Sequence, residues 1–463
     1  MYFIFWYDYV TLPVYVLLSW LILTRYFRKK HGQNRELYKY FKAGLILKML
    51  GGIGIGLIYE HYYRGAYDGR WFFEGSKVLN TYFRDHPGEF FKVFFSSIKD
   101  FNETNLAGIN MADYFLYANE SFFVAKVGSI FQFLAFGMFL PLSVFFLSLA
   151  YLALWNFFIF IQEEVGIPMK LAAYSTLFIP SVLVWDSSIF KDTITFTGLL
   201  WLFITAYYSF VKPRRLYANL IGFAVAAFFI GSVKVYIVAA FVPFFMLFVF
   251  NSYKNSIKND AVRVLSTPFI LVAALVLIGV FLRNADELLG RYSVENALES
   301  ATSTYNSITT YGGSAGSAYE LNVDFSSPLG ILAAIPVGIN ITLFRPYPWE
   351  YGKVFIFAAS IESMAVLYFT ILIVFFKGGI GMSLRYIRKT PLLQFCLMFT
   401  FLFAFMTGIA AANFGTLVRY KIPCLPFYYL FLAYLYTVKS AELETRRIAR
   451  QTRLSQDIPA HSF

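Results

Sequence analysis

Five stretches of the sequence place acidic and basic side chains beside apolar segments, in types that suit the transfer of a group attached to a phosphate. Two acids, Asp68 and Glu74, follow the second long apolar run, in YYRGAYDGRWFFEGSKVL. A carboxylate can act as a general base toward a hydroxyl group, and cations can stabilise a phosphate as its charge develops. The other charged residues are Lys191 and Asp192 in WDSSIFKDTITF, Lys234 in FIGSVKVYIVAAFVP, Arg345 with Glu350 in FRPYPWE, and Arg419 with Lys421 in NFGTLVRYKIPCLPF.

Each of these residues also has a purely structural interpretation. Asp68 could be a solvated acid of a loop, and Lys191 with Asp192 could pair and cap the start of a helix. Lys234 could extend from an ordinary hairpin to the membrane interface, and the two arginines could clamp neighbouring loops. The functional interpretation therefore depends on all these side chains meeting on one face of the molecule.

The elements that must position these residues are expected to be membrane-spanning helices. The chain has 463 residues, of which 58% are hydrophobic and 14% are charged. In soluble domains about 45–50% of the residues are hydrophobic and about 25% are charged. Lipid accepts only helices or closed barrels, and the alternating ten-residue segments of a barrel are absent. The sequence therefore predicts an all-α, polytopic membrane protein.

About eleven apolar runs are long enough to span a bilayer. These runs are 8–27, 43–59, 141–161, 171–190, 192–211, 217–232, 235–250, 264–283, 354–376, 392–411 and 424–438. Two shorter apolar segments, 122–138 and 329–344, are expected to form interfacial or re-entrant helices at the outer surface.

The distribution of charge predicts the orientation of the spans. When successive spans cross the membrane in alternating directions, Lys and Arg gather in the loops on one side of the membrane and acids gather in the loops on the other side. Because cytoplasmic loops are enriched in basic residues, the amino end is predicted outside and the carboxyl end inside. The expected organisation is one transmembrane domain over residues 1–438, with outer loops 60–121 and 284–350, and a basic cytoplasmic tail over 439–463. Basic loops also account for the net charge of +12, so nucleic acid is not an expected partner.

Other motifs predict structure rather than chemistry. Cys396 and Cys424 lie in apolar runs and are expected to be small core residues. The four histidines lie far apart, so no histidine-rich metal site is predicted. The glycines of GGIGIG, residues 51–56, form a small-residue helix face that favours close helix packing.

With these stretches the chain resembles the GT-C class of membrane glycosyltransferases, in a form similar to bacterial polysaccharide-biosynthesis membrane proteins. The resemblance covers islands between about residues 55 and 435. They are Tyr62, Tyr63, Gly65 and Asp68 in the first large outer loop, PSVLVWDSSIFKD, the cation Lys234 at the break of an apolar hairpin, and RYKIPCLPF before the last span.

The resemblance implies that Asp68 is the catalytic base and that the donor is a sugar on polyprenyl phosphate or pyrophosphate. Glu74 and Asp192 would support the base, or bind the acceptor or a divalent metal. The cations that would hold the phosphate are Lys191, Lys234, Arg345 and Arg419. The chain departs from the class in having a lone acid in YDG, an extra span before the usual first helix, and no sizeable soluble domain after the membrane core.

The sequence thus favours an enzyme of the bacterial inner membrane that moves a lipid-linked sugar to a glycan, lipid or protein acceptor on the outer face. A polysaccharide polymerase of the O-antigen type, relying on arginines, is the alternative. A transporter for the same lipids would need a cation-lined path, but few charges lie within spans, namely Lys48 and Glu362. We expect Glu362 to be a packing residue with its polar group satisfied. A non-catalytic scaffold would need no clustering of charges.

Overall fold

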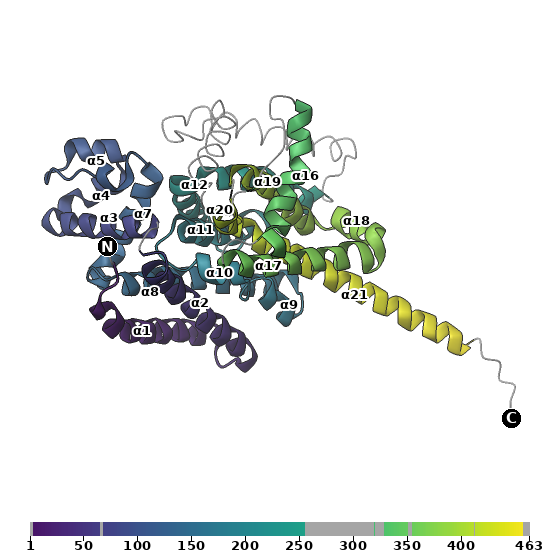
Figure 1. Cartoon of the computed structure of the whole chain (residues 1–463). Helices are drawn as coiled ribbons and strands as arrows, with labels where there is room; N and C mark the ends of the chain where they lie inside the picture. The colour runs from purple at the N-terminus through teal and green to yellow at the C-terminus, as the bar shows by residue number, and fades with distance from the viewer. Residues whose placement is uncertain are drawn as a thin grey trace. The chain divides into compact units, whose positions relative to one another are not determined.

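The computed structural model describes residues 3–64, 68–254, 319, 328–350, 354–411 and 413–456, and these residues form helices without any strand (Figure 1). They divide into two compact units. The first unit contains the described residues up to Phe160 and from Thr176 to Phe241. The second contains Ile161–Ser175 and the described residues from Val242 onward.

Among the described residues, seven helical segments are long and apolar enough to cross a membrane. They are α1 (Trp6–His31), α2 (Arg35–His61), α8 with η2 (Phe139–Phe160 and Ile161–Val165), α11 with η3 (Lys191–Ala206 and Tyr207–Val211), α12 (Leu216–Tyr253), α17 with η8 (Val354–Thr370 and Ile371–Phe376) and α19 (Pro391–Ala410). The prediction of a helical membrane protein is confirmed to this extent. The total number of spans and their orientation stay predictions.

The predicted spans differ from the helices at three places. Residues 171–190 contain two short helices, α9 (Met169–Tyr174) and α10 (Pro180–Trp185), and Pro180, whose missing N–H group is tolerated at a helix start, begins the second. The predicted spans 217–232 and 235–250 are joined in α12, whose backbone leaves the helical region at Lys234 (φ −145°, ψ 74°). The predicted span 264–283 lies outside the described residues.

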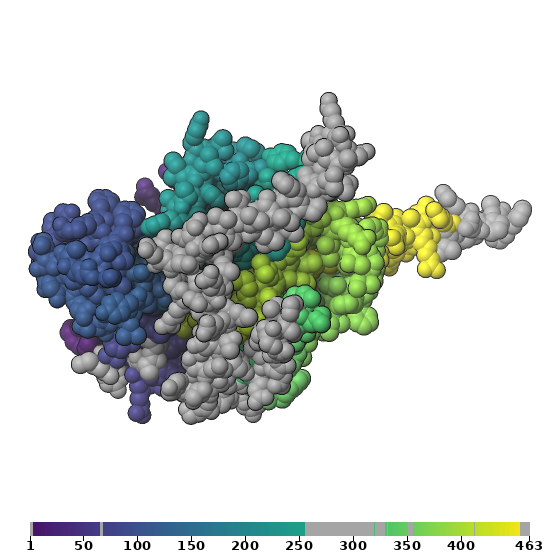
Figure 2. All heavy atoms as spheres, turned by 90° about the horizontal axis from the view of Figure 1, so that it is seen from above, coloured from purple at the N-terminus to yellow at the C-terminus, as the bar shows by residue number. Residues whose placement is uncertain are grey.

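Helix α21 (Leu425–Gln456) contains all but the first residue of the predicted span 424–438 and runs on into the predicted basic tail. It is not among the seven apolar segments. Its carboxyl half extends away from the other helices of the second unit, as Figure 2 shows in yellow. The described part of the tail is therefore helical.

The predicted outer loop 60–121 is a packed helical layer rather than an irregular loop. It contains α3 (Asp68–Asp85), α4 (Phe90–Phe95), α5 (Ile98–Thr104) and α6 (Ala112–Phe115), which pack with α7 (Asn119–Ala135) around one apolar core. In α3, the buried side chains recur every three or four residues and so share one helix face. The Asn80 amide joins α3 to α7 by donating to the Ser129 carbonyl at 2.9 Å.

Three helix ends of the first unit meet at the same level. The Glu60 carboxylate at the end of α2 accepts the Phe3 N–H just before α1 at 3.1 Å. The Asp8 carboxylate in the first turn of α1 accepts the Leu140 N–H in the first turn of α8 at 2.9 Å. Acids at helix amino termini are favourable because the N–H groups there lack partners within the helix. The start of α1 therefore lies beside the end of α2 and the start of α8, so the directions of α1, α2 and α8 alternate.

The glycine face of α2 allows the segment around α10 to approach closely. A Cβ atom at Gly51 would lie 2.2 Å from the Leu183 carbonyl oxygen, and one at Gly52 would lie 2.6 Å from the Ser187 carbonyl oxygen. A Cβ atom at Gly54, by contrast, would have nothing within 4 Å. The prediction of close helix packing is confirmed at Gly51 and Gly52, and this contact draws the WDSS segment into the first unit.

The second unit is built on α16 (Pro328–Phe344), which packs along α19. A Cβ atom at Gly408 would lie 2.2 Å from the Gly338 carbonyl oxygen, and the Thr342 hydroxyl donates to the Ala404 carbonyl at 2.6 Å. The segment 329–344 was expected to be interfacial or re-entrant. The structure packs it against α19, one of the seven apolar segments, and its position relative to the membrane stays a prediction.

Candidate functional site

The predicted site residues fall into both units. Asp68, Glu74, Lys191, Asp192 and Lys234 belong to the first unit. Arg345 and Arg419 belong to the second unit and are described with it.

Asp192 and Lys234 form a buried ion pair. Asp192 lies in the first turn of α11, and Lys234 lies at the non-helical point of α12. Their charged atoms are 2.5 Å apart, and their side chains are 3% and 7% exposed. Because successive side chains of a helix point about 100° apart, Asp192 and its neighbour Lys191 turn to different partners. The break in α12 thus brings a cation to the start of α11.

Lys191 is the first residue of α11 and interacts with two acids, Glu120 and Asp68, and with the nearby cation Lys234. Its ammonium lies 3.3 Å from the Glu120 carboxylate of α7, and both side chains are partly exposed, at 24% and 35%. The charge of Asp68 also acts on Lys191. A cation at a helix amino terminus opposes the helix dipole, so these acids offset an otherwise unfavourable position. Lys191 therefore connects α11 with α3 and α7.

Asp68 is the first residue of α3, and its side chain is exposed. A carboxylate at this end of a helix is stabilised by the free N–H groups of the first turn. The exposed position lets Asp68 reach a substrate, and its electrostatic interaction with Lys191 joins it to the charged group at the start of α11.

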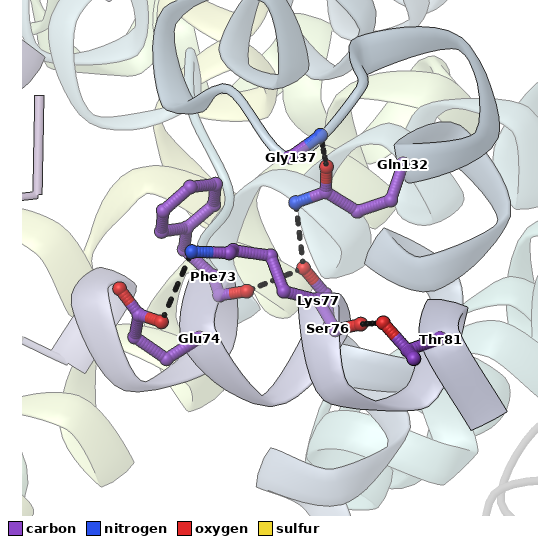
Figure 3. A network of polar contacts seen from close by, with 7 residues as sticks. All are labelled: Phe73, Glu74, Ser76, Lys77, Thr81, Gln132 and Gly137. Atoms are coloured by element: carbon purple, nitrogen blue, oxygen red, sulfur yellow. Dashed lines mark hydrogen bonds and ion pairs between the residues drawn. The ribbon is translucent and has the colours of Figure 1, made fainter. Parts of the chain in front are cut away.

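Glu74 lies farther along α3 and faces another way. Asp68 and Glu74 are six residues apart, and in a helix this spacing makes their side chains point about 120° away from each other. Glu74 forms an ion pair with Lys77 at 3.5 Å, and Figure 3 shows the two side chains reaching toward one another along α3. The charge of Glu74 also acts on Tyr7 near the start of α1. The structure thus does not place Glu74 on the same face of α3 as Asp68.

Sequence reasoning missed a second buried ion pair beside this group. The Lys48 ammonium of α2 lies 3.0 Å from Asp186, and both side chains are 0% exposed. The ammonium also donates to the Val182 carbonyl at 2.8 Å, and the charge of Asp192 acts on Asp186. The second carboxylate oxygen of Asp186 has no hydrogen-bond partner among the described residues. The signal for this pair was present, because a charge within a span calls for a partner, but the partner could not be named.

An apolar groove opens next to the charged group. It has a volume of about 320 Å³ and lies between α7, α8, α11 and α12. Thr193, which follows Asp192 in the chain, lines the groove together with Val127, Phe131, Phe146, Trp201 and Phe229. The charged start of α11 therefore continues directly into a cavity that suits a hydrocarbon chain.

In the second unit, Arg345 is held as a clamp. Its guanidinium forms an ion pair with Glu350, in which Nε donates to Oε2 at 3.1 Å. The guanidinium also lies over the rings of Tyr319 and Phe414, 5.6 and 5.1 Å from their centroids. These contacts favour the structural interpretation of Arg345.

The buried cation of the last stretch is Lys421 rather than Arg419, which is half-buried on α20 (Phe414–Tyr420). Lys421 donates to the Ser363 hydroxyl at 2.9 Å and to the Arg345 carbonyl at 3.4 Å. Burial lowers the pKa of the Lys421 ammonium. Nearby, Glu362 accepts a hydrogen bond from Tyr429 at 3.3 Å, as expected for a packing residue with its polar group satisfied.

In the part of the chain that the structure describes, no group of three or more His, Cys, Asp or Glu side chains is placed to hold a metal ion. The chain matches no family model, no curated protein and no solved structure. The case for a function must therefore be built on the charged group and the groove themselves.

Proposed function

We propose that the protein is a membrane glycosyltransferase of the GT-C type, which moves a sugar from a polyprenyl-linked donor to a glycan, lipid or protein acceptor. The observation that carries the proposal is the meeting of three features in the first unit: the exposed acid Asp68, the partly exposed cation Lys191, and the apolar groove. The outer face of the bacterial inner membrane is the proposed location, on the basis of the charge distribution.

The groove suits the lipid part of the donor. Its volume lies at the lower end of the range of about 300–1,000 Å³ that is usual for ligand pockets. Its lining is apolar and comes from helices that include three of the apolar segments, α8, α11 and α12. A chain lying in this groove would place its phosphate near Thr193 and therefore near the start of α11.

Lys191 is the proposed phosphate ligand. Its pairing with Glu120 is partly exposed, so the phosphate of the donor, whose oxygens also accept charge-assisted hydrogen bonds, can compete with that carboxylate for the ammonium. Lys234 is buried against Asp192, so it would bind phosphate only if Asp192 changed partners. The roles proposed for Arg345 and Arg419 in phosphate binding rest on the sequence resemblance. Those of Glu74 and Asp192 beside the base are hypotheses from the sequence.

Asp68 is the proposed general base. The acceptor hydroxyl oxygen would attack the anomeric carbon of the donor and form the new glycosidic bond, while Asp68 takes the hydroxyl proton. The bond between the anomeric carbon and the phosphate oxygen breaks, and its electron pair leaves with the phosphate. Lys191 would stabilise the charge that develops on that oxygen.

Transfer by the Asp68→Asn variant tests this proposal. The purified protein in lipid nanodiscs is supplied with radiolabelled sugars on polyprenyl phosphate, and the product is separated from the donor. Loss of the base should lower the rate by about 10²-fold or more. Asp113→Asn is the matched control, because Asp113 is an exposed acid at α6 of the same helical layer. Normal transfer by Asp68→Asn would remove the base assignment, and a loss confined to Arg419→Ala would favour a polymerase.

A further inference from the structure

Helix α4 exposes two phenylalanines that nothing in the proposed catalytic role requires. Phe91 and Phe95 are 73% and 68% exposed. They are four residues apart and so lie on the same helix face. On the other side of α4, Val93 is buried in the core of the helical layer, and Phe90 and Phe94 pack against that core. The short helix therefore has an inner apolar face that is covered and an outer apolar face that is not.

A buried lysine fastens α4 to the layer. The Lys126 ammonium of α7 donates to the Phe94 carbonyl at 2.8 Å and to the Ser96 carbonyl at 3.0 Å. It also lies over the Phe122 ring, 4.6 Å from the centroid. These contacts hold the carboxyl end of α4 in place, so the outward direction of Phe91 and Phe95 is built into the packing.

The exposed face of α4 continues the exposed stripe of a candidate span. On α12, the exposed side chains recur at spacings of three and four residues and so form one stripe, made of Tyr217, Ile221, Val225 and Phe228. The Phe95 ring contacts Phe228 at the end of this stripe, with 5.8 Å between the ring centroids. Since α12 is apolar enough to cross a membrane, its exposed stripe is the surface expected to face lipid.

We propose that α4 docks into the interface of the lipid bilayer through Phe91 and Phe95. Aromatic side chains favour the level of the lipid headgroups, and short amphipathic helices lie in that plane with their apolar face toward the acyl chains. Lys92, exposed between the two phenylalanines, can extend its ammonium toward lipid phosphates. This contact sets the helical layer that carries Asp68 and Glu120 at the membrane surface, and it holds whether or not the protein is a glycosyltransferase.

Site-directed spin labelling of the full chain in liposomes tests the proposal. Both cysteines of the described residues, Cys396 and Cys424, are buried, so a nitroxide added to Phe91→Cys or Phe95→Cys reports on α4. Glu103→Cys is the control, because Glu103 is an exposed, charged residue on α5 of the same layer. The measured quantity is the collision rate of each label with oxygen, which concentrates in lipid, and with a nickel chelate, which stays in water.

The labels at 91 and 95 should show an oxygen-to-nickel ratio several-fold higher than the label at 103. Because the Phe95 ring contacts Phe228, the variant at 95 carries a folding risk, and the label at 91 decides the test alone if that variant aggregates. A ratio at 91 equal to that at 103 would overturn the proposal by placing the face in water. An immobile label at 91 that neither reagent reaches would overturn it too, by showing that protein covers the face.

Discussion

Replacing Lys48 with Met should be among the most damaging single substitutions in the first unit. The change keeps the length and apolar stem of the side chain but removes the ammonium that lies 3.0 Å from Asp186. Asp186 is 0% exposed, and one of its oxygens already has no hydrogen-bond partner among the described residues. Leaving a buried charge without its partner costs about 3–5 kcal/mol. We therefore expect Lys48→Met to lower the free energy of unfolding by that amount.

The second arm removes both charges. In Lys48→Met/Asp186→Leu no uncompensated charge remains, and replacing a buried ion pair with apolar residues is often close to neutral. The double variant should therefore recover most of the loss, with an interaction energy of at least about 2 kcal/mol in the double-mutant cycle. The assay is reversible unfolding of the purified protein in mixed detergent micelles, followed by circular dichroism.

The pair of Lys92 and Glu89 on the surface provides the control. It has the same separation of 3.0 Å but is exposed, so Lys92→Met should cost less than about 1 kcal/mol. The reasoning is refuted if Lys48→Met costs no more than Lys92→Met. It is also refuted if the double variant loses the sum of the two single losses.

Two further predictions concern packing and pH. Gly51→Ala should destabilise the protein by about 1–3 kcal/mol, because the added Cβ atom would lie 2.2 Å from the Leu183 carbonyl oxygen. Gly54→Ala should be neutral or slightly stabilising, because nothing lies within 4 Å of a Cβ atom at that position. Equal effects of the two changes on unfolding would contradict the packing of α2. Burial lowers the pKa of Lys126 from 10.5 to about 8. Between pH 8 and 10.5 the unfolded chain therefore binds more protons than the folded protein does. The free energy of unfolding should rise with pH over this range, by about 3 kcal/mol in all. In Lys126→Met this rise between pH 8 and 10.5 should disappear, and a rise as large as that of the wild type would show that Lys126 is not its source.

The class of the protein could be predicted from the sequence because lipid leaves few choices. A bilayer accepts long apolar helices, so the runs near residues 8–27, 43–59 and 392–411 coincide with α1, α2 and α19. Within residues 171–190, Pro180 marks the start of a second helix, a position that suits proline. The helical layer of residues 68–135 was also encoded, since the buried positions of α3 recur with helical spacing. The charged residues that lie between these buried positions favoured the prediction of a loop.

The partners of the charged residues could not be predicted in the same way. Lys48 and Asp186 are separated by 138 residues, and Lys234 and Asp192 by 42. Which acid meets which lysine depends on the packing of whole helices, here on the close approach of Leu183 to the glycine face of α2. Sequence spacing identifies residues that need a partner, but only the tertiary structure selects the partner.

The central claim is that the charged start of α11 and the adjoining groove bind an anionic lipid. It is tested most directly by the affinity of the protein in nanodiscs for a polyprenyl phosphate, compared between wild type and Lys191→Met. A charge-assisted hydrogen bond contributes about 1.5–3 kcal/mol, so the variant should bind at least about tenfold more weakly. Lys99→Met, which removes an exposed lysine of α5, should bind as the wild type does, and inorganic phosphate should compete poorly because it lacks the chain. Equal affinity of the wild type and Lys191→Met would contradict the claim.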